Sequence, residues 1–161
     1  GNGDIYWVRH VLDMIKCDVF SILRPTSPFR TSKTIKRAWD QFSISRNTDS
    51  IRAVELCNQH PNKMWRIDGE RLKPIIDMSG CSLPYQSLPD VSVQNASLEM
   101  EWRDVVYKKG TISGTKINPF FTEGYEGFDI NIYYDLKYAE WLIETGVKLP
   151  KIATVNNWGS W

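Results

Sequence analysis

Two oxygen-bearing side chains two positions apart, Asp129 and Asn131, form the pair in this sequence best suited to hold a metal ion. They lie in the short segment Phe128-Asp129-Ile130-Asn131, which reads as extended chain. Residues two apart in an extended segment point to the same side, so both oxygens would face one ligand. Hard oxygen ligands of this kind suit Mg²⁺, which also binds substrate phosphates. An isolated Asp-x-Asn also occurs in turns and helix caps, so the spacing alone leaves both interpretations open.

A second candidate site is the polar loop that follows the apolar run Val19–Leu23. Thr26, Ser27 and Arg30 stand in this loop among two prolines, which fix the backbone and make the loop stiff. Two hydroxyls and a cation on a rigid turn could anchor a phosphorylated or sugar ligand. The alternative is a plain strand-to-helix connection with a helix cap.

The hydrophobic periodicity predicts the elements that must position these residues. Helical spacing is found at 4–16, 33–43, 102–107 and 134–145, and strand patterns at 18–23, 50–57, 93–100 and 116–121. The first four elements alternate helix and strand, which favours a parallel sheet covered by helices. The run 18–23 is almost wholly apolar, as expected of a central parallel strand. Pro119 places the strand 116–121 at a sheet edge or end.

The middle of the chain, residues 64–92, reads as an insertion. A hairpin pattern surrounds the turn Asp68-Gly69-Glu70, and a loop-rich stretch with a glycine and two prolines follows. Its apolar residues would be exposed on such an arm and would need a partner surface. The alternative is a flap that packs on its own subunit.

Composition narrows the class of protein. The 161 residues suffice for one domain with a core, and a net charge of +1 gives no basic field for nucleic acid. No apolar run is long enough to span a membrane, and the N-terminus lacks a signal-peptide pattern. Three cysteines without C-x-x-C spacing fit a reducing, cytoplasmic setting and no zinc site. The aperiodic tail 147–161 could be pinned by Trp158 and Trp161 or could fray.

Four separate segments resemble one known family, the acylneuraminate cytidylyltransferases. Residues 23–30, L-R-P-T-S-P-F-R, resemble the family signature L-Q-P-T-S-P-L-R. The F-D-I-N segment followed by D-L-K-Y-A-E at 135–140 resembles the block I-D-I-D/N-T-x-x-D-L-x-x-A-E. His60-Pro61-Asn62-Lys63 resembles a His-Pro-x-Lys segment, and Asn95-Ala96-Ser97 resembles an N-G-A segment with alanine in place of glycine. The resemblance covers residues 5 to about 150.

The resemblance implies a Rossmann-like nucleotidyltransferase fold, in three α/β/α layers with a mostly parallel sheet and an inserted β arm. It implies transfer of CMP from CTP to the anomeric hydroxyl of a nonulosonic, sialic-acid-like sugar, with Mg²⁺ as cofactor and release of pyrophosphate. In this family the segment matching 64–92 forms the dimerisation arm, so we expect a homodimer. No nucleic acid or membrane partner is expected.

The resemblance also carries site residues over to matching positions. It implies catalytic roles for Lys63 and Asp129, metal ligation by Asp129 and Asn131, and substrate binding by Arg24, Thr26, Ser27, Arg30 and Asn95. Arg24 replaces the usual glutamine and could pair with the sugar carboxylate, or could signal a different acceptor. Tyr85 and Val93 stand where many members have arginines.

The family's opening strand and basic glycine-rich loop, P-A-R-x-G-S-K, have no counterpart in this sequence. That loop cradles the CTP phosphates with backbone amides. The chain resembles the C-terminal two-thirds of the enzyme, without its opening β-α units, and we expect that it does not turn over CTP alone. Two alternatives are a non-catalytic sugar-acid-binding or oligomerisation module, and a related nucleotidyltransferase that acts on another sugar phosphate.

Overall fold

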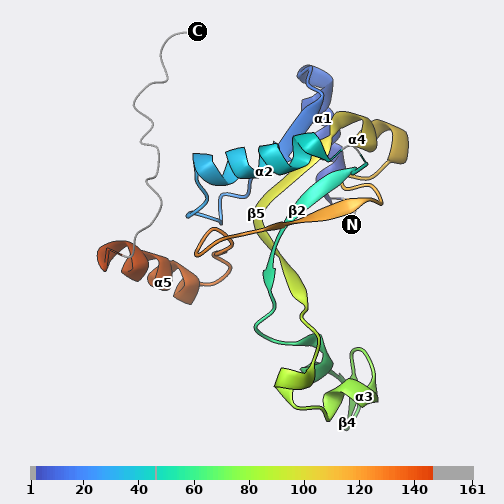
Figure 1. Ribbon diagram of the computed structural model, residues 1–161, viewed down its shortest axis with the longest axis vertical. Helices are drawn as coiled ribbons and strands as arrows, with labels where there is room; N and C mark the ends of the chain where they lie inside the picture. Colours follow the sequence, from blue (N-terminus) through green and yellow to red (C-terminus); the bar gives the residue numbers. More distant parts are fainter. Residues whose placement is uncertain (1–2, 46, 147–161) are drawn as a thin grey trace. The chain divides into compact units, whose positions relative to one another are not determined.

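The structure, a computed structural model, describes residues 3–45 and 47–146 (Figure 1). The chain divides into two compact units, of which the second is Glu55–Val93 and the first comprises the residues before and after it. The first unit contains α1 (Gly3–Met14), β1 (Val19–Ile22), α2 (Ser32–Ile44), β2 (Ser50–Leu56), β5 (Ser92–Trp102), α4 (Arg103–Lys109), β6 (Ile117–Phe121) and α5 (Tyr133–Glu144). Strands β2 and β5 each extend by a few residues into the second unit. All eight elements expected from periodicity are therefore confirmed, and the tail 147–161 lies outside the described residues.

The four strands form one sheet in the order β1-β5-β2-β6. β1 pairs antiparallel with β5, with Phe20 opposite Glu101, whereas β2 and β6 pair in parallel. The α/β class is therefore confirmed and the sheet is mixed, while a mostly parallel, Rossmann-like sheet stays a prediction. The prediction of a central parallel strand at 18–23 is wrong, because β1 lies at an edge of this sheet.

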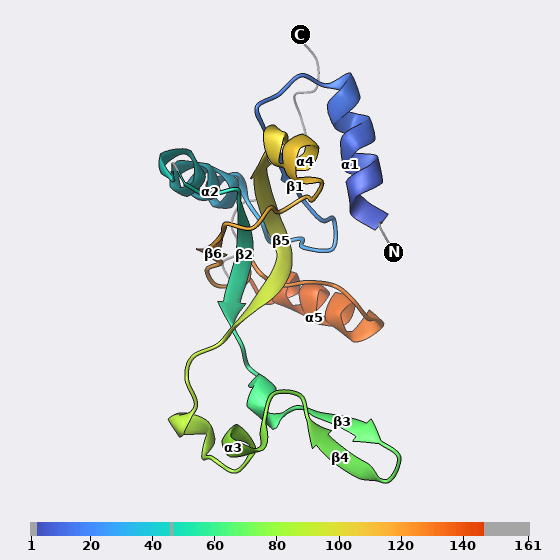
Figure 2. The same cartoon turned by 90° about the vertical axis from the view of Figure 1, so that its right-hand side faces the viewer.

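The apolar character of β1 has a physical reason other than a central position. Helices lie on both faces of the sheet, as Figure 2 shows for α2 on one side of β5 and α1 on the other. Val19 packs against the α2 cluster, and Ile22 packs against α1 and α4. Even an edge strand is therefore apolar on both faces. The two clusters are built from Ala38, Phe42, Ile51, Ala53, Leu98, Met100 and Phe120 on the α2 side, and from Val8, Leu12, Ile22 and Val106 on the α1 side.

Local sequence signals fix the helix ends. Thr31 caps α2 through a capping box with Thr34. Gly146 follows α5 with φ of 65°, a left-handed conformation that suits glycine and ends the helix.

A third apolar cluster joins α5 to the proline-rich loop. Phe29 from the loop is buried against Ala139 and Leu142 of α5, and Phe128 and Tyr125 complete the contact. This packing holds the polar residues before Phe29 next to the segment that leads into α5.

The second unit is small and mostly exposed. It contains a 3₁₀ turn (Pro61–Lys63), the hairpin β3 (Trp65–Asp68) and β4 (Arg71–Pro74), the short helix α3 (Met78–Cys81) and a second 3₁₀ turn (Tyr85–Ser87). The predicted hairpin and its turn are confirmed. The role of residues 64–92 as a dimerisation arm stays a prediction. None of the described helices has the length and apolar character needed to cross a membrane.

Candidate functional site

The proline-rich loop and the Asp-x-Asn segment meet in the first unit. The backbone N–H of Ile130 donates to the carbonyl oxygen of Thr26 at 2.9 Å. The loop leaves β1 at its carboxyl end, and the Asp-x-Asn segment follows β6. Residues more than a hundred positions apart are therefore held side by side, as expected of a ligand site in an α/β sheet.

Two side-chain oxygens at this junction are buried and have no hydrogen-bond partner among the described residues. They are the hydroxyl of Ser27, a residue only 3 % exposed, and Oδ1 of Asp129. A buried polar atom without a partner carries a desolvation penalty, so such atoms often mark a place where a ligand, ion or water binds. Asp129 Oδ2, by contrast, accepts a hydrogen bond from the Asn131 amide at 2.9 Å.

The donor set at this junction fits a hydrated Mg²⁺. Asp129 Oδ1 offers one carboxylate oxygen, and the amide oxygen of Asn131 lies on a residue already bonded to that carboxylate. Mg²⁺ is commonly held by only one or two protein carboxylates, with waters and substrate phosphates as the other ligands. The described residues contain no cluster of three or more His, Cys, Asp or Glu side chains that would form a complete protein cage.

Helix α5 begins directly after these residues. Asp135 Oδ2 accepts hydrogen bonds from the backbone N–H groups of Asn131 at 2.9 Å and Ile132 at 3.0 Å. A carboxylate in the first helical turn satisfies otherwise unpaired N–H groups and complements the helix dipole. Asp135 thus fixes the backbone at Asn131.

Arg30 closes the base of the loop. Its guanidinium donates to the carbonyl oxygen of Ser97 on β5 and to the carbonyl oxygen of Arg24 at 3.3 Å. Burial lowers the pKa of Arg30 from its ordinary value. The guanidinium binds backbone carbonyls in this structure, so its described contacts tie the loop to the sheet.

Arg24 belongs to a chain of charged side chains. It forms an ion pair with Asp4 of α1 at 2.5 Å, and its guanidinium lies 3.7 Å from Glu99 of β5. Glu99 in turn pairs with Arg52 of β2 at 2.9 Å. The hydrogen bond between Arg24 and Asp4 raises the pKa of Arg24 and lowers the pKa of Asp4.

Asn95 lies near the start of β5, at the end of the sheet where β2 and β6 terminate. Its amide donates to the hydroxyl of Thr122 at 3.0 Å, and its amide oxygen accepts from the N–H of Ser97. Thr122 also donates through its backbone N–H and hydroxyl to the carbonyl of Val54. Asn95 therefore joins the ends of three strands.

Lys63 belongs to the second unit, whereas the seven other predicted site residues belong to the first. Its ammonium donates to the carbonyl oxygens of Cys81 and Leu83, each at 2.6 Å. These bonds fold the loop after α3 onto the first 3₁₀ turn.

Glu101 is the titratable residue whose chemistry sequence reasoning missed. Its side chain is fully buried on β5, and neither carboxyl oxygen has a partner among the described residues. Burial, reinforced by the nearby charge of Glu99, raises the pKa of Glu101 to about 9, and Arg52 opposes this only in part. Glu101 is therefore protonated at neutral pH.

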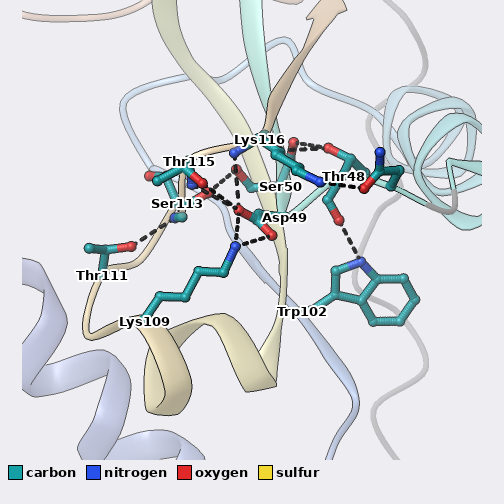
Figure 3. A network of polar contacts seen from close by, with 11 residues as sticks. Thr48, Asp49, Ser50, Trp102, Lys109, Thr111, Ser113, Thr115 and Lys116 are labelled. Atoms are coloured by element: carbon teal, nitrogen blue, oxygen red, sulfur yellow. Dashed lines mark hydrogen bonds and ion pairs between the residues drawn. The ribbon is translucent and has the colours of Figure 1, made fainter.

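A network of polar contacts surrounds Asp49, at the start of β2 (Figure 3). Its carboxylate accepts from the Lys109 ammonium at 2.7 Å and from the backbone N–H groups of Thr115 and Lys116. These donors hold the pKa of Asp49 well below its usual range. Gly114 packs so closely that an added Cβ would lie 2.4 Å from Asp49 Oδ2, and its φ of 69° also favours glycine. Because the Asp49 carboxylate already accepts these hydrogen bonds, its role is structural: it holds the loop 110–116 against the start of β2.

The loop before the Asp-x-Asn segment is anchored by residues that no motif indicated. Glu126 accepts a hydrogen bond from Thr34 at 2.6 Å and pairs with Arg37, both on α2. A glutamate in a glycine-punctuated loop carries no signal of such a role, so only the fold reveals it.

The chain is similar to a protein of flagellin modification. No known protein family profile matches the chain. A Campylobacter coli protein named post-translational flagellin modification protein B is 28 % identical over 135 residues. The match covers 82 % of this chain and 56 % of that protein, so the chain spans little more than half the length of this relative.

Proposed function

We propose that this chain forms the acceptor-sugar and metal-binding part of a cytidylyltransferase that transfers CMP from CTP to a nonulosonic acid. The observation that carries the proposal is the junction at which Ile130 bonds to Thr26. The two segments that meet here both resemble the same family. Each contributes one buried side-chain oxygen without a hydrogen-bond partner among the described residues, from Ser27 and from Asp129. Similarity to a flagellin-modification protein is in keeping with a role in supplying an activated sugar for protein modification.

In the proposed reaction, the anomeric hydroxyl of the sugar attacks the α-phosphorus of CTP. A new phosphorus–oxygen bond forms between the sugar oxygen and the α-phosphorus. The bond from that phosphorus to the bridging oxygen of the β-phosphate breaks, pyrophosphate leaves with the electron pair, and the proton of the sugar hydroxyl passes to solvent water. Mg²⁺, held by Asp129 with Asn131 beside it, would neutralise phosphate charge. Thr26 and Ser27 would position the substrate with their hydroxyls, and Arg24 and Asn95 would face the sugar. Arg30 would keep the loop on the sheet.

Calorimetric titration with CTP and CMP in the presence of Mg²⁺ tests this proposal, on the present chain and on a longer protein extended by its native flanking sequence. We expect the longer protein to bind CTP and to release pyrophosphate when the sugar acid is added. Asp129→Ala should lower turnover at least about a hundredfold, because it removes the carboxylate that carries the metal. Asp40→Ala, at an exposed position on α2, is the matched control and should retain activity.

A binding module without catalysis is the second candidate. Two observations favour it: Lys63 is bonded to carbonyls of its own unit, and Arg24 is paired with Asp4. Binding of the sugar acid without CTP binding or pyrophosphate release in the longer protein would support this candidate and contradict the enzymatic proposal.

A homodimer through residues 64–92 remains part of the proposal. The apolar residues Ile67, Leu72 and Met78 are exposed in this segment, as a surface that meets a partner would be.

A further inference from the structure

Two segments of the first unit run side by side in opposite directions. One is the proline-rich loop with the start of α2, and the other is the loop that leads into α5. The N–H of Ile130 donates to the carbonyl oxygen of Thr26 at 2.9 Å, and the hydroxyl of Thr34 donates to the Glu126 carboxylate at 2.6 Å. Residue numbers rise along one segment while those of the bonded partners fall along the other, so a hydrogen bond joins the two segments at each end.

The candidate ligand groups lie between these two hydrogen bonds along the chain. The hydroxyl of Ser27 and Oδ1 of Asp129, both buried and without a hydrogen-bond partner among the described residues, belong to the joined stretches. Between the two bonds the contact is apolar, with the ring centroids of Phe29 and Phe128 5.5 Å apart. The separation of the two oxygens therefore depends on the contacts that bound these stretches.

Glu126 is held from three directions. One carboxylate oxygen accepts from the Thr34 hydroxyl, and the other accepts from the backbone N–H of Glu123 at 2.9 Å and from the guanidinium of Arg37. The Glu126 side chain is 12 % exposed, and Thr34 is fully buried. A carboxylate removed from water is stable only when it is paired and hydrogen-bonded, so these three donors fix its position.

The partners of Glu126 are themselves fixed. The Thr34 hydroxyl accepts from the backbone N–H of Thr31 at 3.1 Å as part of the capping box of α2. Arg37 donates to the carbonyl oxygen of Phe121 at 2.9 Å, at the end of β6. Glu126 therefore ties the loop before the Asp-x-Asn segment to the first two turns of α2 and, through Arg37, to the sheet.

We propose that Glu126 is a positioning residue that fixes Asp129 relative to Ser27 before a metal ion or a phosphate binds. Glu126 precedes Asp129 by three positions, which is at most about 11 Å of chain, so a shift of one displaces the other. A binding constellation must be held to within about 0.5 Å by its supporting contacts. The inference rests on the proposed metal-binding function, because Asp129 is the expected ligand.

Three variants separate this role from a general effect of charge. Glu126→Ala removes every contact of the side chain. In Glu126→Gln the amide oxygen can accept from Arg37 and from the N–H of Glu123, and the amide N–H can donate to the Thr34 hydroxyl, which can turn its own proton to Thr31, 3.0 Å away. Glu123→Ala is the matched control, because it removes a 74 % exposed carboxylate that pairs with the same arginine at 3.4 Å.

Amide hydrogen exchange in the full 161-residue chain is the first measurement. The N–H of Ile130 should exchange about tenfold faster in Glu126→Ala and at the wild-type rate in Glu126→Gln and Glu123→Ala. The amide of Met100, in the buried part of β5, is the internal reference and should not change. An unchanged rate at Ile130, an equal acceleration at Met100, or a loss in Glu126→Gln as large as in Glu126→Ala would overturn the proposal.

Titration with Mn²⁺, followed by electron paramagnetic resonance, is the second measurement and needs neither CTP nor a sugar. The dissociation constant should rise about tenfold in Glu126→Ala and stay near the wild-type value in Glu126→Gln, while Asp129→Ala should abolish binding. Equal affinity in Glu126→Ala and the wild type would contradict the positioning role.

The two measurements distinguish failure of this inference from failure of the proposed function. If the wild-type chain binds no Mn²⁺, or binds it without need of Asp129, the proposed metal site fails, and exchange at Ile130 still decides the role of Glu126. If Glu126→Ala does not fold, Thr34→Val takes its place, because it removes the same bond from the α2 side and keeps the shape of the buried side chain.

Discussion

The first unit of the chain is held together by apolar packing, and the second by hydrogen bonds. Three buried apolar clusters lie in the first unit, whereas every residue of β3 and all but the last of β4 are exposed. In the second unit, His60 bonds the carbonyl of Pro89, and the hydroxyl of Tyr85 donates to Cys57 and Asn58. Asp77 caps α3 through the N–H groups of Ser79 and Gly80.

This difference shows that the two units should respond to different perturbations. Burial of apolar surface contributes most of the stability of a packed unit, while an individual hydrogen bond contributes little net free energy. We therefore expect the first unit to unfold globally and the second to open locally at lower free energy. The following predictions test that contrast.

The largest effect should follow from Phe42→Ala in the first unit. Phe42 is fully buried between α2 and the sheet, so its truncation leaves a cavity and should lower the free energy of unfolding by about 3–5 kcal/mol. Leu72→Ala, at a 61 % exposed position in β4, should change it by less than about 0.5 kcal/mol. Urea unfolding followed by tryptophan fluorescence measures both. An equal loss of unfolding free energy in the two variants would contradict the proposed difference between the two units.

The next effect concerns pH and Glu101. Between about 4.5 and about 9 only the folded state holds a proton on this carboxyl, so the folded state binds more protons. The free energy of unfolding should then fall as pH rises, by about 1.4 kcal/mol per pH unit. Glu101→Gln, which cannot ionise, should lose this slope in urea unfolding measured from pH 6 to 8. A slope that persists in the variant would show that another group titrates.

A smaller and local effect is expected for Lys63→Met. The variant leaves the carbonyls of Cys81 and Leu83 without their donor, so amide hydrogen exchange in residues 80–84 should accelerate about tenfold. Lys63→Arg, which keeps a cation, should recover part of the protection. The urea midpoint of the first unit should not move, and a shift there would contradict the separation of the two units.

The smallest effect is expected at Asp77, with a pH dependence opposite to that of Glu101. The Ser79 hydroxyl and the Gly80 N–H lower the pKa of Asp77. Its stabilising contribution is thus present above about 3.8, the ordinary value, and is lost as pH falls through the lowered pKa. Exchange protection of α3, relative to Asp77→Asn, should disappear on acidification. A constant ratio from pH 6 to 3 would exclude this role.

The elements of the fold were predictable from sequence because their periods are clear. The α2 pattern, the hairpin turn at Gly69 and the edge position of the strand containing Pro119 all follow from local chemistry. The position of β1 was not predictable, because an edge strand covered on both faces has the same apolar composition as a central one. Strand direction depends on partners that no local pattern identifies.

The candidate site was predictable only in part, for a related reason. Motifs identified the two segments that meet at Thr26 and Ile130. One segment carries hydroxyl groups and an arginine in a proline-rich loop, and the other carries an Asp-x-Asn pair. The alternation Glu99-Met100-Glu101 indicates which residues share a face of β5, but not that the polar face is buried. The saturated carboxylate of Asp49 depends on a loop sixty residues away, so sequence reasoning could not find it.

The second unit leaves and rejoins the sheet through neighbouring strands. β2 and β5 are adjacent in the sheet, and just beyond β2 the N–H of Cys57 donates to the carbonyl of Val91 at 2.8 Å. The intervening segment is thus a cassette whose two ends already meet. A gene that lost or exchanged residues 58–90 would need only a tight turn to close the hairpin, so this region can diverge, recombine or be transplanted while the sheet keeps its register.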